Sequence, residues 1–393
     1  MAVKIVPPQT ASPVRALPDL ASLAPAPATP PGIEASAAPI RVGVIGFGYW
    51  GPNVVRNFSE VPGSQVWGVS DLREERLAEA HARYPAITTT ADPRSLINDP
   101  AIDAVIIMTP ISTHYRLALE ALEAGKHVLV AKPLVTSSEQ AIHLIEEAER
   151  RQRVLMVDHT FIYTGAVRRI KELVDSGSLG RLYYYDSVRV NLGLFQHDVN
   201  VLWDLAVHDL TIMDYVMPGS TRAVAATGAA HIQGHPVNMA YLTCFFDDTL
   251  LAHHHVNWLA PVKVRRTLIG GDRQMIVYDD LEPSEKVKVY DKGITLTNRS
   301  ERVYESLVGY RTGDMWAPHL SLTEGLRVEA QHFMECIRTG QQPLSDGRAA
   351  LRVIRILEAA STSLLQRGQP VELPSDESAG QPVDERQSPA DSA

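Results

Sequence analysis

A glycine-rich turn early in the chain has the spacing of a phosphate-binding loop. Gly46-Phe47-Gly48-Tyr49-Trp50-Gly51 reads GxGxxG and follows a short apolar run, and Pro52 suits the first turn of a helix. The first glycine permits a tight turn, the second lets the backbone approach a pyrophosphate, and the third allows close helix packing. Free N–H groups at the start of the helix would attract the phosphates. This turn is therefore predicted to bind a dinucleotide.

A carboxylate follows at the position where the adenosine ribose of such a cofactor would lie. Asp71 comes after the next apolar run, 20 residues beyond Gly51. A carboxylate there accepts hydrogen bonds from the ribose hydroxyls and repels a 2′-phosphate, which favours NAD over NADP. Arg73 and Arg76 could each reach a 2′-phosphate, so NADP stays open as the alternative cofactor.

Three polar side chains farther along the chain suit the oxidation of a hydroxyl group. Lys132 directly follows an apolar run, at the edge where open α/β sheets bind ligands, and its ammonium would stabilise a developing alkoxide. Asp204 and His208 are four residues apart, so they share one face of a helix. His208 suits proton removal near neutral pH, and Asp204 would orient it or raise its pKa. These three are candidates for catalysis; a surface lysine and an ordinary half-buried histidine are the plain alternatives.

The elements that must position these residues alternate between strand and helix in the first half of the chain. Short buried strands are expected at 41–46, 65–70, 104–108, 128–131 and 154–157, with a weaker one at 87–89. Amphipathic helices are expected at 53–59, 74–83, 113–124 and 138–152. This alternation predicts an α/β Rossmann fold, a doubly wound parallel sheet covered by helices.

The second half has a different pattern, in which strands follow one another without intervening helices. After a helix at 164–176, strands are expected at 181–191, 222–228, 239–246, 250–258, 263–270 and 274–278, and helices at 324–338 and 346–366. The pattern predicts an α+β domain with a mostly antiparallel open sheet. Because one face of such a sheet would be left exposed, we expect a homodimer or homotetramer.

The length and the ends of the chain suggest the domain organisation. At about 150 residues per domain, 393 residues suggest two or three domains. Residues 1–39 contain nine prolines and no strand or helix period, and 374–393 are mostly polar, so both are predicted to be disordered tails. The remainder divides into a predicted NAD(P)-binding domain, 40–160, and a predicted substrate and oligomerisation domain, 161–373.

Composition excludes several classes of function. A net charge of −9 without a basic run argues against nucleic acid and anionic membranes as partners. No apolar run approaches the roughly 18 residues of a membrane span. The two cysteines, Cys244 and Cys336, exclude a disulfide scaffold and a thiolate zinc site. His253–His255 would face alternate sides of a strand, so no metal site is expected. We expect a soluble, cytoplasmic protein.

Three segments, in this order, resemble the glucose–fructose oxidoreductase and inositol dehydrogenase family, known as Gfo/Idh/MocA. They are the GxGxxG turn, Ala124–Pro133 (AGKHVLVAKP) and Trp203–Asp209 (WDLAVHD), and the resemblance covers residues 40–373. It implies a catalytic lysine before a proline and an aspartate and histidine on a helix of the second domain. These match the three residues singled out above for their chemistry: Lys132, Asp204 and His208.

The resemblance also implies which other residues line the cofactor. They lie in the loop after the fourth strand and beside the catalytic lysine, and are Thr109, Pro110, His114 and Pro133. Lys126 is expected to face the cofactor too. Pro133 would follow a cis peptide bond, as in relatives. One position departs from the family: the glutamate before the lysine, which helps hold the nicotinamide ribose in relatives, is Ala131 here.

Within the family, the chain looks most like the nucleotide-sugar 3-dehydrogenases. The stretches that carry this likeness are Gly48–Asn53 and Asn191–Gln196. The likeness implies NAD-dependent oxidation of the C3 hydroxyl of a UDP-sugar, such as UDP-N-acetylglucosamine or its uronate. A dehydrogenase of free sugars or inositol, or a non-catalytic regulator that binds dinucleotide, are the alternatives.

Two residues before the second catalytic segment are expected to meet the substrate. Arg189 and Asn191 share one face of a strand because they are two residues apart. Arg189 would suit a phosphate or carboxylate, and a solvated strand face is the alternative. Asp209 is expected to be exposed on its helix, and Asp214 to act as a cap or ion-pair partner.

Overall fold

The computed structural model describes residues 38–193, 199–246, 249–297 and 307–374. Nearly all of the two predicted tails, 1–37 and 375–393, therefore lies outside the described residues, as does the end of the predicted substrate stretch, 194–196. In the part of the chain that is described, no helix is long and apolar enough to cross a membrane.

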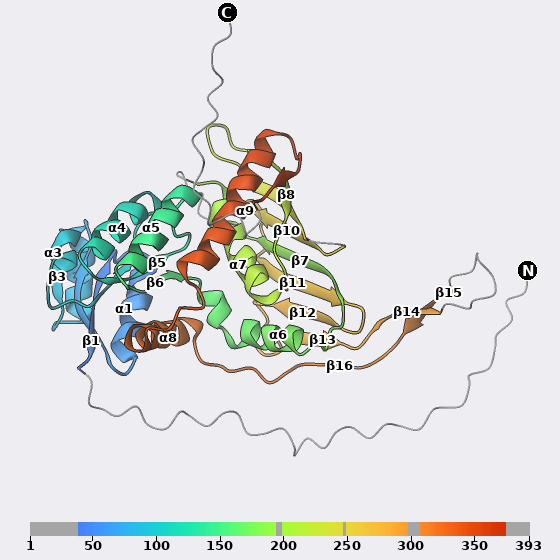
Figure 1. The fold of residues 1–393 in the computed structure, drawn as a ribbon, viewed down its shortest axis with the longest axis horizontal. Helices are drawn as coiled ribbons and strands as arrows, with labels where there is room; N and C mark the ends of the chain where they lie inside the picture. Colours follow the sequence, from blue (N-terminus) through green and yellow to red (C-terminus); the bar gives the residue numbers. More distant parts are fainter. Residues whose placement is uncertain (1–37, 194–198, 247–248, 298–306, 375–393) are drawn as a thin grey trace, which may run out of the picture. The chain divides into compact units, whose positions relative to one another are not determined.

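The first half forms the predicted parallel sheet, whose six strands lie in the order β3-β2-β1-β4-β5-β6 (Figure 1). The strands are β1 (Ile40–Ile45), β2 (Ser64–Ser70), β3 (Thr88–Thr90), β4 (Ala104–Ile107), β5 (His127–Ala131) and β6 (Leu155–Asp158). The connecting helices are α1 (Gly51–Glu60), α2 (Glu74–Arg83), α3 (Pro93–Ile97), η2 (Ile111–Thr113), α4 (His114–Glu123) and α5 (Ser138–Arg150). The Rossmann prediction is confirmed; only the short α3 and η2 were not predicted.

The second half forms a nine-stranded sheet in the order β16-β13-β12-β11-β7-β10-β9-β8-β17. Its strands are β7 (Leu182–Val190), β8 (Ala223–Ala229), β9 (Met239–Phe245), β10 (Leu251–Asn257), β11 (Val264–Gly271), β12 (Met275–Asp279), β13 (Val287–Tyr290), β16 (Met315–Trp316) and β17 (Val371–Glu372). Neighbouring strands of this sheet are antiparallel, except that β7 and β10 are parallel. The predicted mostly antiparallel sheet is confirmed, and β14 (Gly293–Thr297) and β15 (Leu307–Arg311) form a separate hairpin.

Some helices of the second half cover one face of this sheet, and others reach back to the first half. They are η3 (Thr160–Tyr163), α6 (Gly165–Asp175), η4 (Leu202–Ala206), α7 (Val207–Val216), α8 (Gly325–Thr339) and α9 (Gly347–Leu365). α9 packs on β8 and α7, whereas α8 packs on α1 beside the parallel sheet (Figure 1). A late segment of the chain therefore covers the helix that follows the glycine-rich turn.

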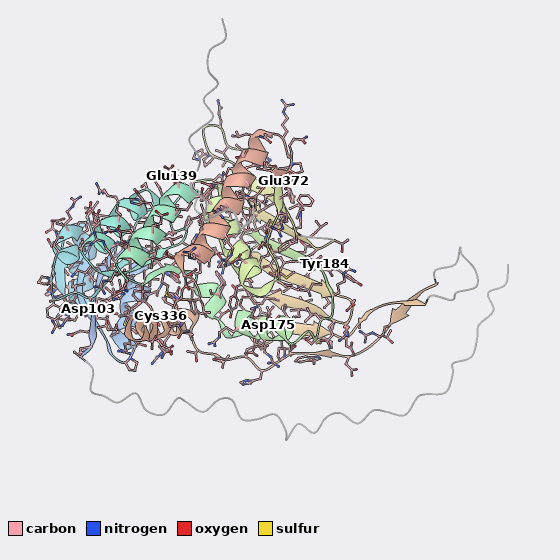
Figure 2. All side chains as sticks on the ribbon, viewed as in Figure 1. Asp103, Glu139, Asp175, Tyr184, Cys336 and Glu372 are labelled. Atoms are coloured by element: carbon pink, nitrogen blue, oxygen red, sulfur yellow. The ribbon has the colours of Figure 1, made fainter. Side chains whose placement is uncertain are left out.

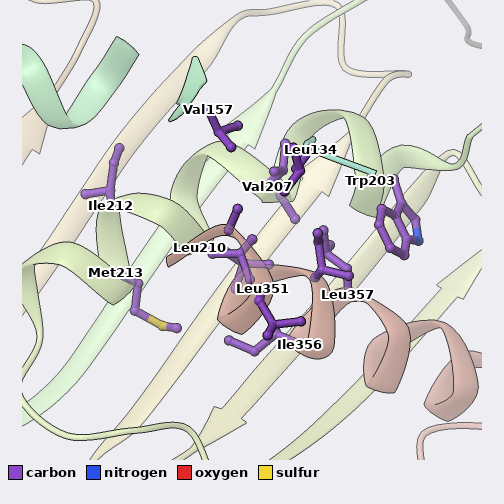
Figure 3. Close-up of a cluster of buried hydrophobic side chains, with 14 of the residues drawn as sticks. Leu134, Val157, Trp203, Val207, Leu210, Ile212, Met213, Leu351, Ile356 and Leu357 are labelled. Carbon is purple, nitrogen blue, oxygen red and sulfur yellow. The ribbon is translucent and has the colours of Figure 1, made fainter. Parts of the chain in front are cut away.

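A buried apolar cluster joins the two halves and fixes the helix that carries Asp204 and His208. Figure 3 shows Leu134, which follows β5, and Val157 of β6 packed with side chains of η4, α7 and α9. The labelled members include Leu134, Val157, Trp203, Val207, Leu210, Leu351 and Leu357, all at most 9% exposed. Because this contact is apolar and close-packed, it holds the start of α7 against the carboxyl ends of β5 and β6.

Candidate active site

The glycine-rich turn has the shape that a pyrophosphate needs. Gly46 has a φ of 100°, and a Cβ there would lie 2.4 Å from the carbonyl oxygen of Met108. A Cβ on Gly51 would lie 2.4 Å from the carbonyl oxygen of Gly46. Only glycine fits both positions, because a side chain would collide with the backbone. The turn leads into the N-terminus of α1, and Tyr49 beside it is 92% exposed.

Asp71 supports this turn and presents a charge beside it. Its Oδ2 accepts a hydrogen bond of 2.8 Å from the N–H of Phe47, and its Oδ1 accepts one of 3.0 Å from the N–H of Arg73. Burial alone would raise the pKa of this carboxyl, but these bonds and the Arg73 side chain outweigh it and lower the pKa. Asp71 is therefore an anion at the end of β2, as an NAD site requires.

The two arginines that left NADP open both have acidic partners. The Nε of Arg73 lies 3.2 Å from Oδ1 of Asp71, and the Nη1 of Arg76 lies 2.9 Å from Oε2 of Glu79. These pairs reduce the positive charge available to a 2′-phosphate. The residues present therefore fit NAD.

The loop after β4 is tied to the turn that carries Lys132. The ring of His114 is buried, with Nε2 2.8 Å from the carbonyl oxygen of Thr109 and Nδ1 3.0 Å from that of Pro133. The Lys132–Pro133 peptide bond is cis, as expected. The expectation that Lys126 faces the cofactor is wrong. Lys126 precedes the amino end of β5, opposite to the end that carries Lys132, and its ammonium donates to the carbonyl oxygens of Asp99 and Ile102.

Lys132 and Asp204 form the centre of the site. The Nζ of Lys132 lies 2.8 Å from the carbonyl oxygen and 3.3 Å from Oδ1 of Asp204, and both side chains are about one-fifth exposed. Burial lowers the pKa of Lys132, and the charge of Asp204 opposes that shift. Trp258, which sequence reasoning missed, donates from Nε1 to Oδ2 of Asp204 at 3.0 Å. Both carboxylate oxygens of Asp204 are thus engaged.

His208 lies just beyond Asp204, but the helix between them is not regular. Asp204 belongs to η4, a π-helical turn, and His208 to the first turn of α7. Burial, and then the charges of Lys132 and Arg189, lower the pKa of His208 well below 6.5. The expected rise in this pKa from Asp204 does not prevail, because burial and the charge of Lys132 act in the opposite direction. The carboxylate of Asp204 instead bonds to Lys132 and Trp258. His208 is therefore a neutral imidazole at neutral pH, the form that accepts a proton.

Two residues at the end of β6 were missed by the sequence analysis. Asp158 accepts hydrogen bonds from Trp50 Nε1 at 2.9 Å and from Thr160 Oγ1 at 2.5 Å. His159 is 3% exposed, and burial, with the charge of Lys132, lowers its pKa to about 3. The signal that could have found them is position: like Lys132, they end a buried parallel strand.

Arg189 does not face a substrate, contrary to its predicted role. Its Nε and Nη2 lie 2.7 Å and 3.0 Å from the two carboxylate oxygens of Asp209, and the two side chains are 3% and 6% exposed. Asp209 is buried rather than exposed, since it neutralises this guanidinium in the core. Asp214 pairs with Arg352 at 2.8 Å, as expected for an ion-pair partner.

Asn191 is connected to the catalytic residues through the strand that leads to Trp258. Its N–H donates to the carbonyl oxygen of Asn257 at 3.0 Å, and Gly193 donates to that of Trp258 at 3.3 Å. Because Trp258 also bonds to Asp204, the described part of the predicted substrate stretch is next to the site. It stays a candidate for substrate contact.

The structure therefore brings most of the predicted site residues to one edge of the parallel sheet. A phosphate-binding turn, an ammonium held by a carboxylate, and a neutral histidine are arranged there. An alcohol placed in this site could give up its hydroxyl proton to the imidazole while the ammonium stabilises the oxygen. That combination suits the oxidation of a hydroxyl group.

Two family models match successive parts of the chain. The first, described as an oxidoreductase family with an NAD-binding Rossmann fold, matches residues 40–159. The second, the GFO/IDH/MocA C-terminal domain, matches residues 167–277. Together they match more than half of the chain.

Individual relatives agree with these matches. A scyllo-inositol 2-dehydrogenase (NAD(+)) of Bacillus subtilis is 26% identical over 350 residues, which covers 85% of this chain and 96% of the relative. A UDP-N-acetylglucosamine 3-dehydrogenase of Acidithiobacillus ferrooxidans is 28% identical over 339 residues, covering 84% and 99%. The solved structure of a levoglucosan dehydrogenase with NADH and L-sorbose has a TM-score of 0.71 at 22% identity, covers 85% and 99%, and shares the fold. The chain is thus an NAD-binding oxidoreductase of the Gfo/Idh/MocA family.

Proposed function

We propose that this chain oxidises the C3 hydroxyl of a UDP-sugar, such as UDP-N-acetylglucosamine or its uronate, to the ketone. Residues 40–160 would bind the cofactor and 161–373 the sugar. When bound in the turn of Gly46, Gly48 and Gly51, NAD supplies the acceptor for the hydride that leaves the carbon. Asp71 would hold its adenosine ribose, and Thr109, Pro110, His114 and Pro133 would line the rest of the cofactor site.

The observation that carries the proposal is the contact between Lys132 and Asp204 beside a neutral His208. Lys132 would donate a hydrogen bond to the substrate hydroxyl and stabilise the oxygen as negative charge develops on it. His208 would accept the hydroxyl proton. Asp204 would aim the ammonium, because its main-chain oxygen and its carboxylate both contact Nζ of Lys132.

The nucleotide-sugar part of the proposal rests on one relative and two sequence stretches. The UDP-N-acetylglucosamine 3-dehydrogenase matches almost its whole length at 28% identity. The stretches Gly48–Asn53 and Asn191–Gln196 carry the same likeness. A second candidate function, oxidation of an inositol, is favoured by the similarly long match to the scyllo-inositol 2-dehydrogenase at 26% identity.

A substrate panel tests the proposal directly. Purified protein would be incubated with NAD and, separately, UDP-N-acetylglucosamine, its uronate, myo-inositol, scyllo-inositol and free glucose, while absorbance of the reduced nicotinamide is recorded. We expect reduction with a UDP-sugar, and a 3-keto product by mass spectrometry. Turnover with an inositol and none with UDP-sugars would replace the lead function by the second candidate.

We also propose that the uncovered face of the nine-stranded sheet joins copies of the chain into a homodimer or homotetramer. Tyr184, labelled on this sheet in Figure 2, is 37% exposed, and Tyr241 is 39% exposed. Tyr241 stacks on His255 at a ring distance of 4.5 Å, so aromatic side chains gather there. Light scattering on the wild type and on Tyr241→Asp should show a smaller particle for the variant. A monomeric wild type would refute this assembly.

A further inference from the structure

Because Arg189 is paired with Asp209, the neighbouring cation Arg265 is the next candidate to face the substrate. β7 and β11 run antiparallel, and their register places Arg189 directly opposite Arg265. Arg265 therefore projects from the same face of the sheet, the face that the helices and the active site cover. The alternation of β11 agrees, because Thr267 and Ile269, two and four residues on, are buried.

Arg265 is connected to His208 through one aromatic ring. Its guanidinium carbon lies 5.8 Å from the ring centroid of Phe161, and the ring of Phe161 meets that of His208 edge-on at 5.1 Å. Arg189 contacts the same ring at 4.7 Å. The side chain of Phe161 thus lies between Arg265 and His208, the proposed base. The charge of Arg265 is among the causes of the lowered pKa of His208.

The hydrogen-bonding capacity of Arg265 is only partly used. Its Nη1 lies 3.1 Å from Oδ2 of Asp280. Its Nε is buried and has no hydrogen-bond partner among the described residues, although the side chain as a whole is 29% exposed. Asp280 has a second cation, since Nζ of Lys286 lies 3.7 Å from its Oδ1. Two positive charges therefore face one negative charge, whereas Arg189 and Lys132 each have a carboxylate.

We infer that Arg265 binds an anionic oxygen group of the substrate and so sets the specificity of this site for anionic sugar derivatives. The inference rests on the proposed function and names the substrate class more closely. The anionic group would be either the carboxylate of a uronate or the diphosphate of a nucleotide sugar. A guanidinium suits both, because its planar fork of N–H donors matches carboxylate and phosphate oxygens.

Binding measurements on Arg265→Gln separate these two groups. Calorimetry would use protein saturated with NADH and four compounds: UDP-N-acetylglucosamine, its uronate, free N-acetylglucosamine and free glucuronate. One lost bond to a charged group typically weakens affinity about 10- to 100-fold. We expect that loss for the uronates alone if the carboxylate is bound, or for both UDP-compounds if the diphosphate is bound. Equal affinity of wild type and Arg265→Gln for all four compounds would overturn the inference.

Two further variants keep the test interpretable. Arg266→Gln is the matched control, because Arg266 is the next residue on β11, is 56% exposed and pairs with Asp279 at 3.4 Å. It should bind all four compounds as the wild type does, whereas Arg265→Lys should recover part of the lost affinity. If Arg265→Gln does not fold, Arg265→Lys is measured in its place, and a smaller loss of affinity for the same compounds is expected. If the wild type binds free glucuronate through Arg265 but binds no UDP-compound, the UDP-sugar proposal is refuted and the anion-binding role of Arg265 stands. If the wild type binds none of the four compounds, both proposals are refuted.

Discussion

The indole Nε1 of Trp50 donates a hydrogen bond of 2.9 Å to Oδ2 of Asp158, which ends β6. The bond ties the glycine-rich turn after the first strand to the last strand of the parallel sheet. Asp158 is also the register partner of Ala131, the position where the family resemblance implies a glutamate. The carboxylate of Asp158 therefore lies on the strand next to the position where Ala131 replaces the expected glutamate.

We predict that Trp50→Phe weakens NAD binding about 10-fold, because the ring remains but the donor to a charged acceptor is lost. Calorimetric titration with NAD would measure the change. Trp67→Phe is a matched control, since Trp67 also donates from Nε1 to a carboxylate, Asp99, at 3.1 Å but lies in β2 outside the turn. Equal NAD affinity in both variants would show that the Trp50–Asp158 bond does not support the cofactor site.

Asp71→Ala is expected to weaken NAD binding and to relax discrimination against NADP. The ribose would lose its hydrogen-bond acceptor. The N–H of Phe47 would lose the carboxylate that accepts its hydrogen bond. Asp71→Asn keeps an acceptor but removes the charge, so it should relax discrimination with a smaller loss of NAD affinity. Dissociation constants for both cofactors would be compared. A wild type that strongly prefers NADP would refute the role of Asp71 in this choice.

Lys132→Met should lower turnover by ~100- to 1,000-fold, the usual cost of one lost donor to a developing oxyanion. NAD should still bind, since the glycine-rich turn and Asp71 are untouched. Steady-state turnover and a separate NAD titration distinguish the two effects. Full activity of the variant would remove Lys132 from the mechanism.

The pH profile of oxidation should report on His208. Because its pKa is lowered, the imidazole stays neutral and competent through neutral pH, and the rate should fall only well below pH 6.5 as the base becomes protonated. His208→Ala should slow oxidation and abolish that acid inflection, and His208→Gln should behave similarly. An unchanged inflection in both variants would assign proton removal to another group, such as neutral Lys132.

His254 gives a prediction for stability. It is fully buried in β10, and burial lowers its pKa from 6.5 to about 4. Between these values the unfolded chain binds a proton that the folded chain does not, so this contribution destabilises the protein as pH falls from 6.5 towards 4. His254→Gln should therefore show a smaller drop in melting temperature between about pH 7 and pH 5. His253→Gln, on the opposite face of the same strand, should keep the wild-type drop; equal drops in all three proteins would contradict the prediction.

Local patterns in the sequence were enough to predict the parallel sheet and the glycine-rich turn, whereas the candidate catalytic residues were identified with the help of the family resemblance. Buried parallel strands are short apolar runs, and the turn at Gly46 requires a residue without a Cβ, so both leave a signal within a few neighbouring residues. Lys132 could be placed at the ligand-binding edge for the same reason: it directly follows such a run.

Only the tertiary structure decided which charges are paired. The register of β7 with β11 places Arg189 and Arg265 on the same covered face, and the packing of α7 against that face gives Asp209 to Arg189. Likewise, the spacing of Asp204 and His208 suggested that one acts on the other, whereas Lys132 and Trp258 occupy the carboxylate of Asp204. Each partner lies at least 20 residues away in sequence, so no local pattern could reveal it. Ion pairs and the pKa values that depend on them are set by distances across the folded chain.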